Sequence, residues 1–204
     1  MHISEGVLSA PVLLGGAALS AAGVAIGLKK TDYDRLPQVA VLSSAFFVAS
    51  LIHVPVGPTS AHLLLIGLSG LILGWAAFPA ILVALLLQAV LFQFGGLAVL
   101  GVNTFIMAAP AVVAFYLFNA LVRRAAEPVA LSAAFAAGAL PVLAAAALVW
   151  LALWLSGEGL GVAGAVFFAP HVVIAAIEGC VTASVAALLR KARPELLSAP
   201  LVED

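Results

Sequence analysis

The sequence predicts an all-α integral membrane protein with about seven transmembrane helices. Of its 204 residues, 65% are hydrophobic and 8% are charged, whereas a soluble domain carries roughly 25% charged residues. The mean hydropathy is correspondingly high, at +1.28. Long apolar stretches follow one another along the whole chain, and no polar block between them is large enough to fold alone. Residues 1–204 are therefore expected to form a single membrane domain.

Glycine, proline and charged clusters separate the apolar stretches, and each stretch approaches the roughly 17 to 25 residues that cross a bilayer. We place the segments near residues 7–28, 37–53, 60–75, 78–93, 102–123, 128–155 and 164–190. The third and fourth segments meet around Gly74, Trp75 and Pro79. Two short helices or one long bent helix would fit that region.

The basic residues favour two separate segments there and predict the orientation of the chain. All 8 follow the first, fifth or seventh segment: Lys29, Lys30, Arg35, Arg123, Arg124, Arg190, Lys191 and Arg193. With about seven spans these positions share one side of the membrane, whereas fusing two segments would divide them. The positive-inside rule assigns the shared side to the cytoplasm. The prediction is an amino terminus outside and a carboxyl terminus in the cytoplasm.

The histidines fall on the opposite side by the same count of spans. His2, His53 and His62 lie at the outer ends of their segments. His171 lies roughly two helical turns into the last segment, counted from the outer face. The 4 histidines of the chain are thus expected in one half of the membrane. This grouping follows from the charges alone and uses no metal chemistry.

The dipeptide Met1-His2 is a candidate metal chelate. The terminal amine, the amide nitrogen of His2 and its ring nitrogen can close two small rings around one ion. Tetragonal nitrogen coordination suits Ni(II), Cu(II) and related late transition metals. A chance Met-His start is the alternative, and the grouping of the histidines favours the metal. His2 and Glu5 supply no basic region for a cleaved signal peptide, so the amino terminus is expected to be retained.

A short loop rich in proline and glycine separates His53 from His62. Thr59 and Ser60 are candidate helix caps, which would place His62 in the first turn of the third segment. There its imidazole could supply the fourth in-plane nitrogen to the chelate. His53 could be a further ligand, an outer hydrogen-bond acceptor or an interfacial residue.

Two further polar groups lie at membrane depth. Gln88 and Asn103 flank a flexible run between the fourth and fifth segments, which would form a lid over the site, hydrogen-bond partners for its ligands, or an ordinary re-entrant turn. Glu178 follows His171 by seven residues and shares its helical face. An ionisable residue at this depth is a functional candidate, with a structural hydrogen bond to another helix as the alternative.

Several classes of function lack their motifs. The sequence has no nucleotide-binding G-x-x-x-x-G-K-[ST] loop, no H-E-x-x-H and no G-x-S-x-G. We therefore expect a binding component without its own ATPase site, and not an enzyme. A net charge of −1 gives no argument for nucleic acid, and the single Cys180 excludes an internal disulfide. A haem-binding or redox membrane subunit is the alternative function, because paired histidines in a membrane also ligate haem.

Four stretches resemble the CbiM/NikM family, the substrate-specific components of cobalt and nickel energy-coupling-factor transporters. They are residues 1–6 (MHISEG), 59–62 (TSAH), 88–107 (QAVLFQFGGLAVLGVNTFIM) and 171–182 (HVVIAAIEGCVT), the last with Arg-Pro-Glu at 193–195. The resemblance implies a seven-helix protein of a bacterial or archaeal cytoplasmic membrane. It also implies that Ni(II) or Co(II) is the transported substrate, bound by the amine of Met1, the nitrogens of His2 and the ring of His62.

The resemblance further implies partners. A transmembrane coupling (T) protein and cytoplasmic ATPases would supply the energy for uptake, and a small accessory membrane subunit is common in the family. The resemblance does not choose between nickel and cobalt.

Overall fold

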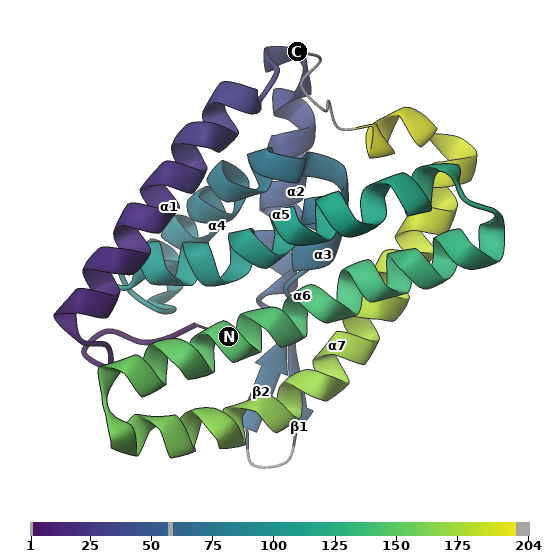
Figure 1. Ribbon diagram of the computed structural model, residues 1–204. Helices are drawn as coiled ribbons and strands as arrows, with labels where there is room; N and C mark the ends of the chain where they lie inside the picture. The colour runs from purple at the N-terminus through teal and green to yellow at the C-terminus, as the bar shows by residue number, and fades with distance from the viewer. Residues whose placement is uncertain (1, 57–58, 199–204) are drawn as a thin grey trace.

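The computed structural model describes residues 2–56 and 59–198, apart from the side chains of residues 53–56, 59–61, 158–167 and 169. This part of the chain forms α-helices, one β-hairpin and short 3-10 helices (Figure 1). The α-helices are α1 (Ala10–Lys30), α2 (Leu36–Ala49), α3 (Ile66–Leu73), α4 (Ala77–Phe92), α5 (Leu100–Arg124), α6 (Glu127–Ser156) and α7 (Glu158–Ala192). The strands are β1 (His53–Val56) and β2 (Thr59–His62), and the 3-10 helices are η1 (Tyr33–Arg35), η2 (Gly74–Ala76) and η3 (Pro194–Leu197).

Within the described residues, 5 helical stretches are long and apolar enough to cross a membrane: Ala10–Lys30, Ile66–Phe92, Leu100–Arg124, Glu127–Ser156 and Pro170–Ala192. The predominantly helical membrane fold is therefore confirmed. The helix α2 has 14 residues, fewer than the roughly 17 that span a bilayer. By length and composition α3, η2 and α4 count as one stretch, so the total of seven transmembrane helices stays a prediction.

The stretch Ile66–Phe92 doubles back at η2. Its beginning lies near His2, because the ring of His62 is stacked on that of His2 with centroids 5.0 Å apart. Its end returns to the same place, since Gln88 is hydrogen-bonded to His2. The turn between them lies at the other end of the molecule, where Lys30 sits 5.7 Å above the ring of Trp75. Gly74 has a φ of +54° at this turn, a conformation that favours glycine.

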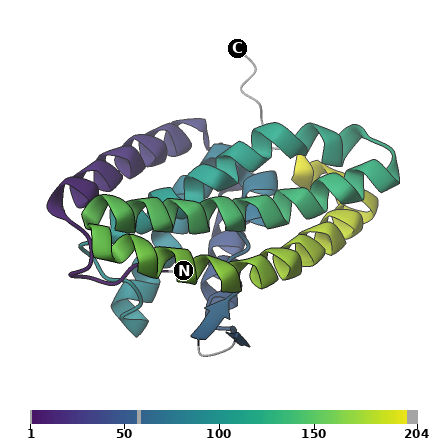
Figure 2. The same ribbon diagram turned by 60° about the horizontal axis from the view of Figure 1, so that its bottom comes forward.

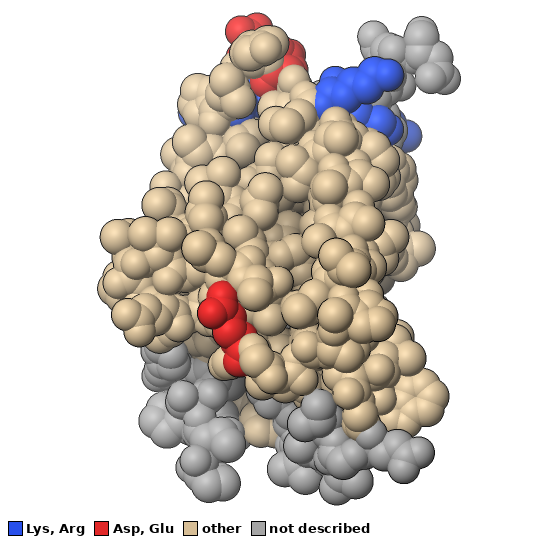
Figure 3. Space-filling view, turned by 90° about the vertical axis from the view of Figure 1, so that its left-hand side faces the viewer, with Lys and Arg blue, Asp and Glu red and all other residues tan. Residues whose placement is uncertain are grey.

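The basic residues gather at the end of the molecule where α1, α5 and α7 finish. Lys191 lies 3.7 Å from Glu127, which begins α6, and Arg190 donates a 2.9 Å hydrogen bond to the carbonyl of Ala125. Arg35 donates to the carbonyl of Ser198. Figure 3 shows Lys and Arg only at the upper end of the face over α1. The sequence predicts that the basic residues share one side, and within the described residues they lie at one end of the molecule.

Burial affects the pKa of Arg35. Desolvation lowers the pKa of its guanidinium from the usual value, the nearby carboxylate of Asp32 opposes that shift, and the positive charge of Arg123 adds to it. Residues that follow α1 and residues that end α5 therefore lie within electrostatic reach of one another.

The helix α3 is the buried centre of the helix packing. All of its residues are buried, and it packs against α5 and α6. Its glycines allow this approach: a Cβ on Gly67 would lie 1.9 Å from the carbonyl oxygen of Ala137, and one on Gly70 would lie 2.1 Å from that of Ala111. Close backbone packing through small residues is typical of membrane helices. Helices α6 and α7 run side by side over one face of this centre (Figures 1 and 2).

The loop between His53 and His62 differs from the expectation. The second segment was expected to be helical to residue 53 and the third from residue 60, but α2 ends at Ala49 and α3 begins at Ile66. Residues 53–56 and 59–62 instead pair as an antiparallel hairpin, with His53 opposite His62. The hairpin projects at the lower edge of the molecule (Figures 1 and 2).

The physical reason for this difference is in the sequence of the loop. Pro55 has no backbone N–H and cannot continue a helix, while Val54 and Val56 favour extended backbone. Thr59 and Ser60 lie in β2, and the residue that precedes α3 is Leu65. His62 is the last residue of β2, so its expected place in the first turn of a helix was wrong.

The close approach at Gly70 predicts a stability effect. Gly70→Ala should lower the free energy of unfolding by about 1–3 kcal/mol, because the new methyl group would force α3 away from α5. The melting temperature of detergent-purified protein, followed by tryptophan fluorescence, measures this. Gly15→Ala is the control, since a Cβ at Gly15 meets nothing within 4 Å. Equal melting temperatures for the two variants would contradict the packing described for α3.

Candidate metal-binding site

The segment after the amino terminus is fixed to the start of α5 by one side chain. The backbone N–H of Ile3 donates to Oδ1 of Asn103 at 3.1 Å, and Nδ2 of Asn103 donates to the carbonyl of Ile3 at 3.1 Å. Asn103 and Ile3 are both buried. Because a carboxamide has a donor and an acceptor side by side, it pairs with the backbone as another peptide unit would. Asn103 therefore determines where His2, the preceding residue, lies.

Glu5 adds a second attachment, to the loop between α4 and α5. Its backbone N–H donates to the carbonyl of Gly95 at 3.2 Å, and its carboxylate accepts from the N–H of Ala98 at 2.9 Å. Two glycines leave room for this contact, with φ values of +76° at Gly95 and +133° at Gly96. A Cβ on Gly96 would lie 2.1 Å from Cγ of Glu5. The glycine-rich loop thus receives the amino-terminal segment.

The two imidazoles of His2 and His62 meet at this end of the molecule. Their ring centroids are 5.0 Å apart and their planes differ by 24°. His2 comes from the segment that Asn103 holds, and His62 comes from the end of β2. Two rings that share one ion would have centroids about 4 to 6 Å apart, since metal–nitrogen bonds are about 2.0–2.1 Å long. The observed distance lies within that range.

A chain of hydrogen bonds continues from His2 into the helices. Oε1 of Gln88 lies 2.7 Å from Nε2 of His2, and Nε2 of Gln88 donates to Oγ of Ser50 at 2.7 Å. The hydroxyl of Ser50 in turn donates to the carbonyl of Phe47 at 2.7 Å. Gln88 and Ser50 are 0% and 1% exposed. Nε2 of His2 is therefore held by buried polar groups on α4 and at the end of α2.

Aromatic side chains lie beside these polar contacts. The rings of His2 and Phe94 are 6.1 Å apart between centroids, Phe94 stacks on Phe92 at 5.8 Å, and Phe92 lies 5.7 Å from Phe47. Three phenylalanine rings thus form a continuous row from α2 to His2.

Glu178 holds the turn that follows His62. Its carboxylate accepts hydrogen bonds from the backbone N–H groups of Leu64 and Leu65, the latter at 2.8 and 3.0 Å. Leu65 has a φ of +50° and directly precedes α3. Its N–H is therefore one of the backbone donors at the start of a helix that have no acceptor within the helix. Of the two roles left open by the sequence, these contacts support the structural one. Glu178 fixes the backbone on which His62 is carried.

The ring of His62 is oriented by its own backbone neighbour. Its Nδ1 lies 3.1 Å from the carbonyl oxygen of Leu63. Because a carbonyl only accepts, Nδ1 carries the proton in this contact. The lone pair of a neutral His62 ring is then on Nε2.

The structure brings together only part of the expected set. His2 contacts both His62 and Gln88, and Asn103 acts through the backbone of Ile3. His171 is buried in α7, which contacts β2. The described residues contain no group of three or more His, Cys, Asp or Glu side chains that could hold a metal. Met1 lies outside the described residues, as does the side chain of His53.

The sequence did not predict Ser50 as a residue of the site. It directly follows the last residue of α2, and a single serine at the end of an apolar segment carries no pattern that separates it from the other serines of the chain. Its role follows only from its contact with Gln88.

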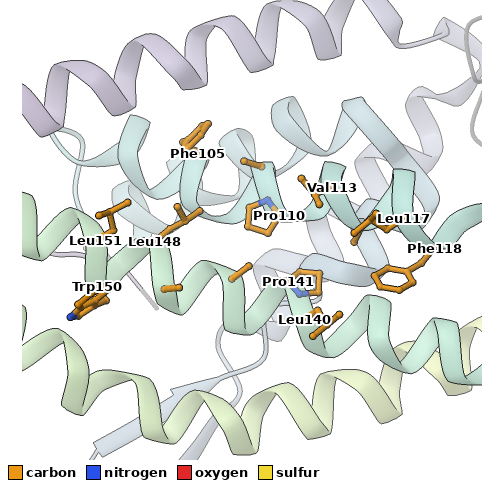
Figure 4. A pocket seen from close by; sticks show the side chains of 14 residues that line it. Phe105, Pro110, Val113, Leu117, Phe118, Leu140, Pro141, Leu148, Trp150 and Leu151 are labelled. Atoms are coloured by element: carbon orange, nitrogen blue, oxygen red, sulfur yellow. The ribbon is translucent and has the colours of Figure 1, made fainter.

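An apolar groove between α5 and α6 is separate from the histidines. It has a volume of about 570 Å³, and its lining includes Phe105, Pro110, Pro141 and Trp150 (Figure 4). Its lining has no histidine, cysteine or carboxylate. This groove therefore offers hydrocarbon contacts and no donor set for a metal ion.

Comparison with known proteins identifies the family of the chain. A family model described as the cobalt uptake substrate-specific transmembrane region, CbiM, matches residues 2–196. A putative metal transport protein of Haemophilus influenzae is 46% identical over 201 residues, which cover 97% of this chain and 97% of that protein. The cobalt transport protein CbiM of Sorangium cellulosum is 35% identical, with 97% of this chain and 94% of that protein covered.

Two further similarities concern nickel and a solved fold. The fused nickel transport protein NikMN of Rhodobacter capsulatus is 34% identical, and the match covers 97% of this chain but 64% of the fused protein. The crystal structure of a truncated transition metal transporter superposes with a TM-score of 0.74 at 26% identity. That match covers 93% of this chain and 98% of the other.

The fold and the paired histidines define a multi-pass membrane protein with a candidate metal site at one end of its helices. The chain belongs to the CbiM family, the membrane components of cobalt and nickel transport in bacteria and archaea. The family resemblance noted in the sequence is confirmed.

The role assigned to Glu178 can be tested by two substitutions. Glu178→Leu removes the acceptor of the buried N–H of Leu64 and the partly buried N–H of Leu65. An unsatisfied buried group costs about 1–3 kcal/mol, so both the melting temperature and metal binding should fall. Glu178→Gln keeps an acceptor oxygen and should retain most of the stability. Thermal unfolding and calorimetry with Ni(II) measure the two effects. Loss of binding in both variants without any loss of stability would show instead that Glu178 is a metal ligand.

Proposed function

We propose that the protein is the substrate-specific component of an energy-coupling-factor transporter that takes up Ni(II) or Co(II). The observation that carries this proposal is the stacking of His2 on His62 at 5.0 Å, because these rings come from unrelated parts of the chain. A buried asparagine holds the segment that bears His2, and a buried carboxylate holds the turn that follows His62. Two separate supports that converge on two imidazoles are expected of a binding site.

The proposed ligand set completes this pair with the amino terminus. The terminal amine of Met1, the amide nitrogen of His2 and its ring nitrogen would supply three nitrogens, and His62 would supply the fourth. This set favours tetragonal Ni(II) or Co(II) over Mg²⁺ and Ca²⁺, which take oxygen ligands. His53 pairs with His62 in the hairpin backbone and is a candidate for a further contact.

We further propose that the helices cross the membrane about seven times as one domain, with the amino terminus outside and the carboxyl terminus in the cytoplasm. The return of Ile66–Phe92 to the histidine end supports this, because it keeps all the basic ends on one side. Metal would then be captured on the outer face. The energy would come from a transmembrane coupling protein and cytoplasmic ATPases, since the sequence has no nucleotide-binding loop. A small accessory membrane subunit is also expected.

A haem-binding or redox subunit receives less support from the geometry. Two axial histidines must lie on opposite faces of the macrocycle, with the iron between their nitrogens. The rings of His2 and His62 instead stack with centroids 5.0 Å apart, which leaves no room for a macrocycle between them. An absorbance spectrum of purified protein distinguishes haem from nickel or cobalt.

The amino terminus provides the decisive test. One serine added before Met1 should abolish high-affinity Ni(II) and Co(II) binding, because the amine would leave the chelate. His2→Ala and His62→Ala should weaken binding by more than the roughly 10- to 100-fold that partners of metal ligands control. Calorimetry on protein with a carboxyl-terminal tag measures this, with His171→Ala as the control of smaller effect. Normal binding by the extended protein would show that the proposed chelate is wrong.

A further inference from the structure

We propose that Ser50 and Gln88 fix the tautomer of His2, so that the proton of its neutral ring is on Nε2 and the lone pair is on Nδ1. Neither residue would touch the metal, so both are positioning residues. The consequence for metal binding rests on the chelate proposed above, whereas the tautomer itself is a property of the metal-free protein.

The direction of each hydrogen bond follows from the last acceptor in the series, the carbonyl of Phe47. The carbonyl of Phe47 has no proton, so the hydroxyl of Ser50 must donate to it. The single hydroxyl proton is then used, and Oγ of Ser50 is an acceptor toward Gln88. The amide group of Gln88 therefore turns its NH₂ toward Ser50 and its oxygen toward His2. Because that oxygen only accepts, Nε2 of His2 must carry the proton.

Burial makes this direction hard to reverse. Gln88 and Ser50 are 0% and 1% exposed, so water offers little alternative to these bonds. Rotating the carboxamide of Gln88 by half a turn would set its oxygen against the acceptor oxygen of Ser50. Avoiding that repulsion would require Ser50 to abandon the carbonyl of Phe47, which would leave a buried acceptor without its bond.

The tautomer matters because only one ring nitrogen of His2 can close the chelate. A ring that joins the amide nitrogen, Cα, Cβ, Cγ and Nδ1 to the metal is small and unstrained, whereas Nε2 lies on the far side of the imidazole. With the proton on Nε2, the lone pair of the neutral ring is on Nδ1, the nitrogen that closes the chelate. A metal-binding histidine commonly donates its other N–H to an acceptor that orients it, and here that acceptor is Gln88.

His62 shows the opposite arrangement. Its Nδ1 donates to the carbonyl of Leu63, which assigns the lone pair of the neutral ring to Nε2. The stacked rings therefore have different tautomers, each set by its own acceptor. This difference gives the two histidines separate spectroscopic signatures.

The test is nuclear magnetic resonance of metal-free protein labelled with ¹⁵N and ¹³C in histidine, recorded where the imidazoles are neutral. The signals of His2 are identified by their absence in His2→Ala. Wild-type His2 should show Nε2–H. Gln88→Met, which removes the acceptor at similar volume, and Ser50→Ala, which lets the carboxamide rotate, should both shift His2 toward a mixture of tautomers. Gln88→Glu keeps an acceptor oxygen and should retain Nε2–H.

Metal affinity provides the second measurement. Gln88→Met should weaken Ni(II) binding by roughly 10- to 100-fold. Gln38→Met makes the same change at the basic end of the molecule, beside Lys30 and Arg35, and should leave both the tautomer and the affinity unchanged. Circular dichroism and size-exclusion profiles confirm that each variant is folded.

The outcomes separate this inference from the proposed function. Wild-type His2 with its proton on Nδ1, or tautomers unchanged in both Gln88→Met and Ser50→Ala, would overturn the role of Ser50 and Gln88 even if nickel binds normally. Wild-type Nε2–H that shifts in these variants supports that role even in a protein that binds neither metal, and the absence of binding would then refute the proposed function alone.

Discussion

The pair of hydrogen bonds between Asn103 and the backbone of Ile3 is the constraint on which the histidine site depends. A short segment before the first helix has no secondary structure to hold it, yet these bonds attach it to the start of α5. Because both partners are buried, the bonds do not compete with bulk water. His2 is carried to Gln88 and His62 as a result, and the glycine-rich loop that accommodates Glu5 completes the attachment.

The contacts of the Lys and Arg side chains lie at one end of the molecule, and the paired imidazoles of His2 and His62 lie at the other. Charged side chains at the ends of α5 and α7 form contacts with Glu127 and the backbone near the basic end. The other end has imidazole, carboxamide and hydroxyl groups that satisfy one another inside the helices. Between these ends α3 is packed so closely that glycine is required at two of its positions. A closely packed centre of this kind holds Asn103 and Glu178, and with them His2 and His62, at fixed positions relative to each other.

Much of the helical architecture could be predicted from the sequence, and the exceptions have identifiable causes. Apolar stretches separated by glycine, proline or charged residues predicted the order of α1, α4, α5 and α6, because hydrophobic length is a local property. The expectation for the region before α3 was wrong, because its two prolines were interpreted as a loop between helices. The pairing of β1 with β2 depends on contacts between two segments, which local composition does not reveal. Glu178 illustrates the same limit, because its partners are backbone groups over a hundred residues away.

The sequence by itself determined the membrane class, the common end of the basic residues, the family and the residues His2, His62, Gln88 and Asn103. Composition, charge order and short motifs are properties of the chain that need no coordinates. Only the tertiary structure decided which of these residues meet: that Asn103 holds the backbone of Ile3, that Gln88 lies 2.7 Å from the ring of His2, and that Gln88 donates to Ser50. Hydrogen bonds have direction and a reach of about 3 Å, so their partners are determined by the packing of distant segments.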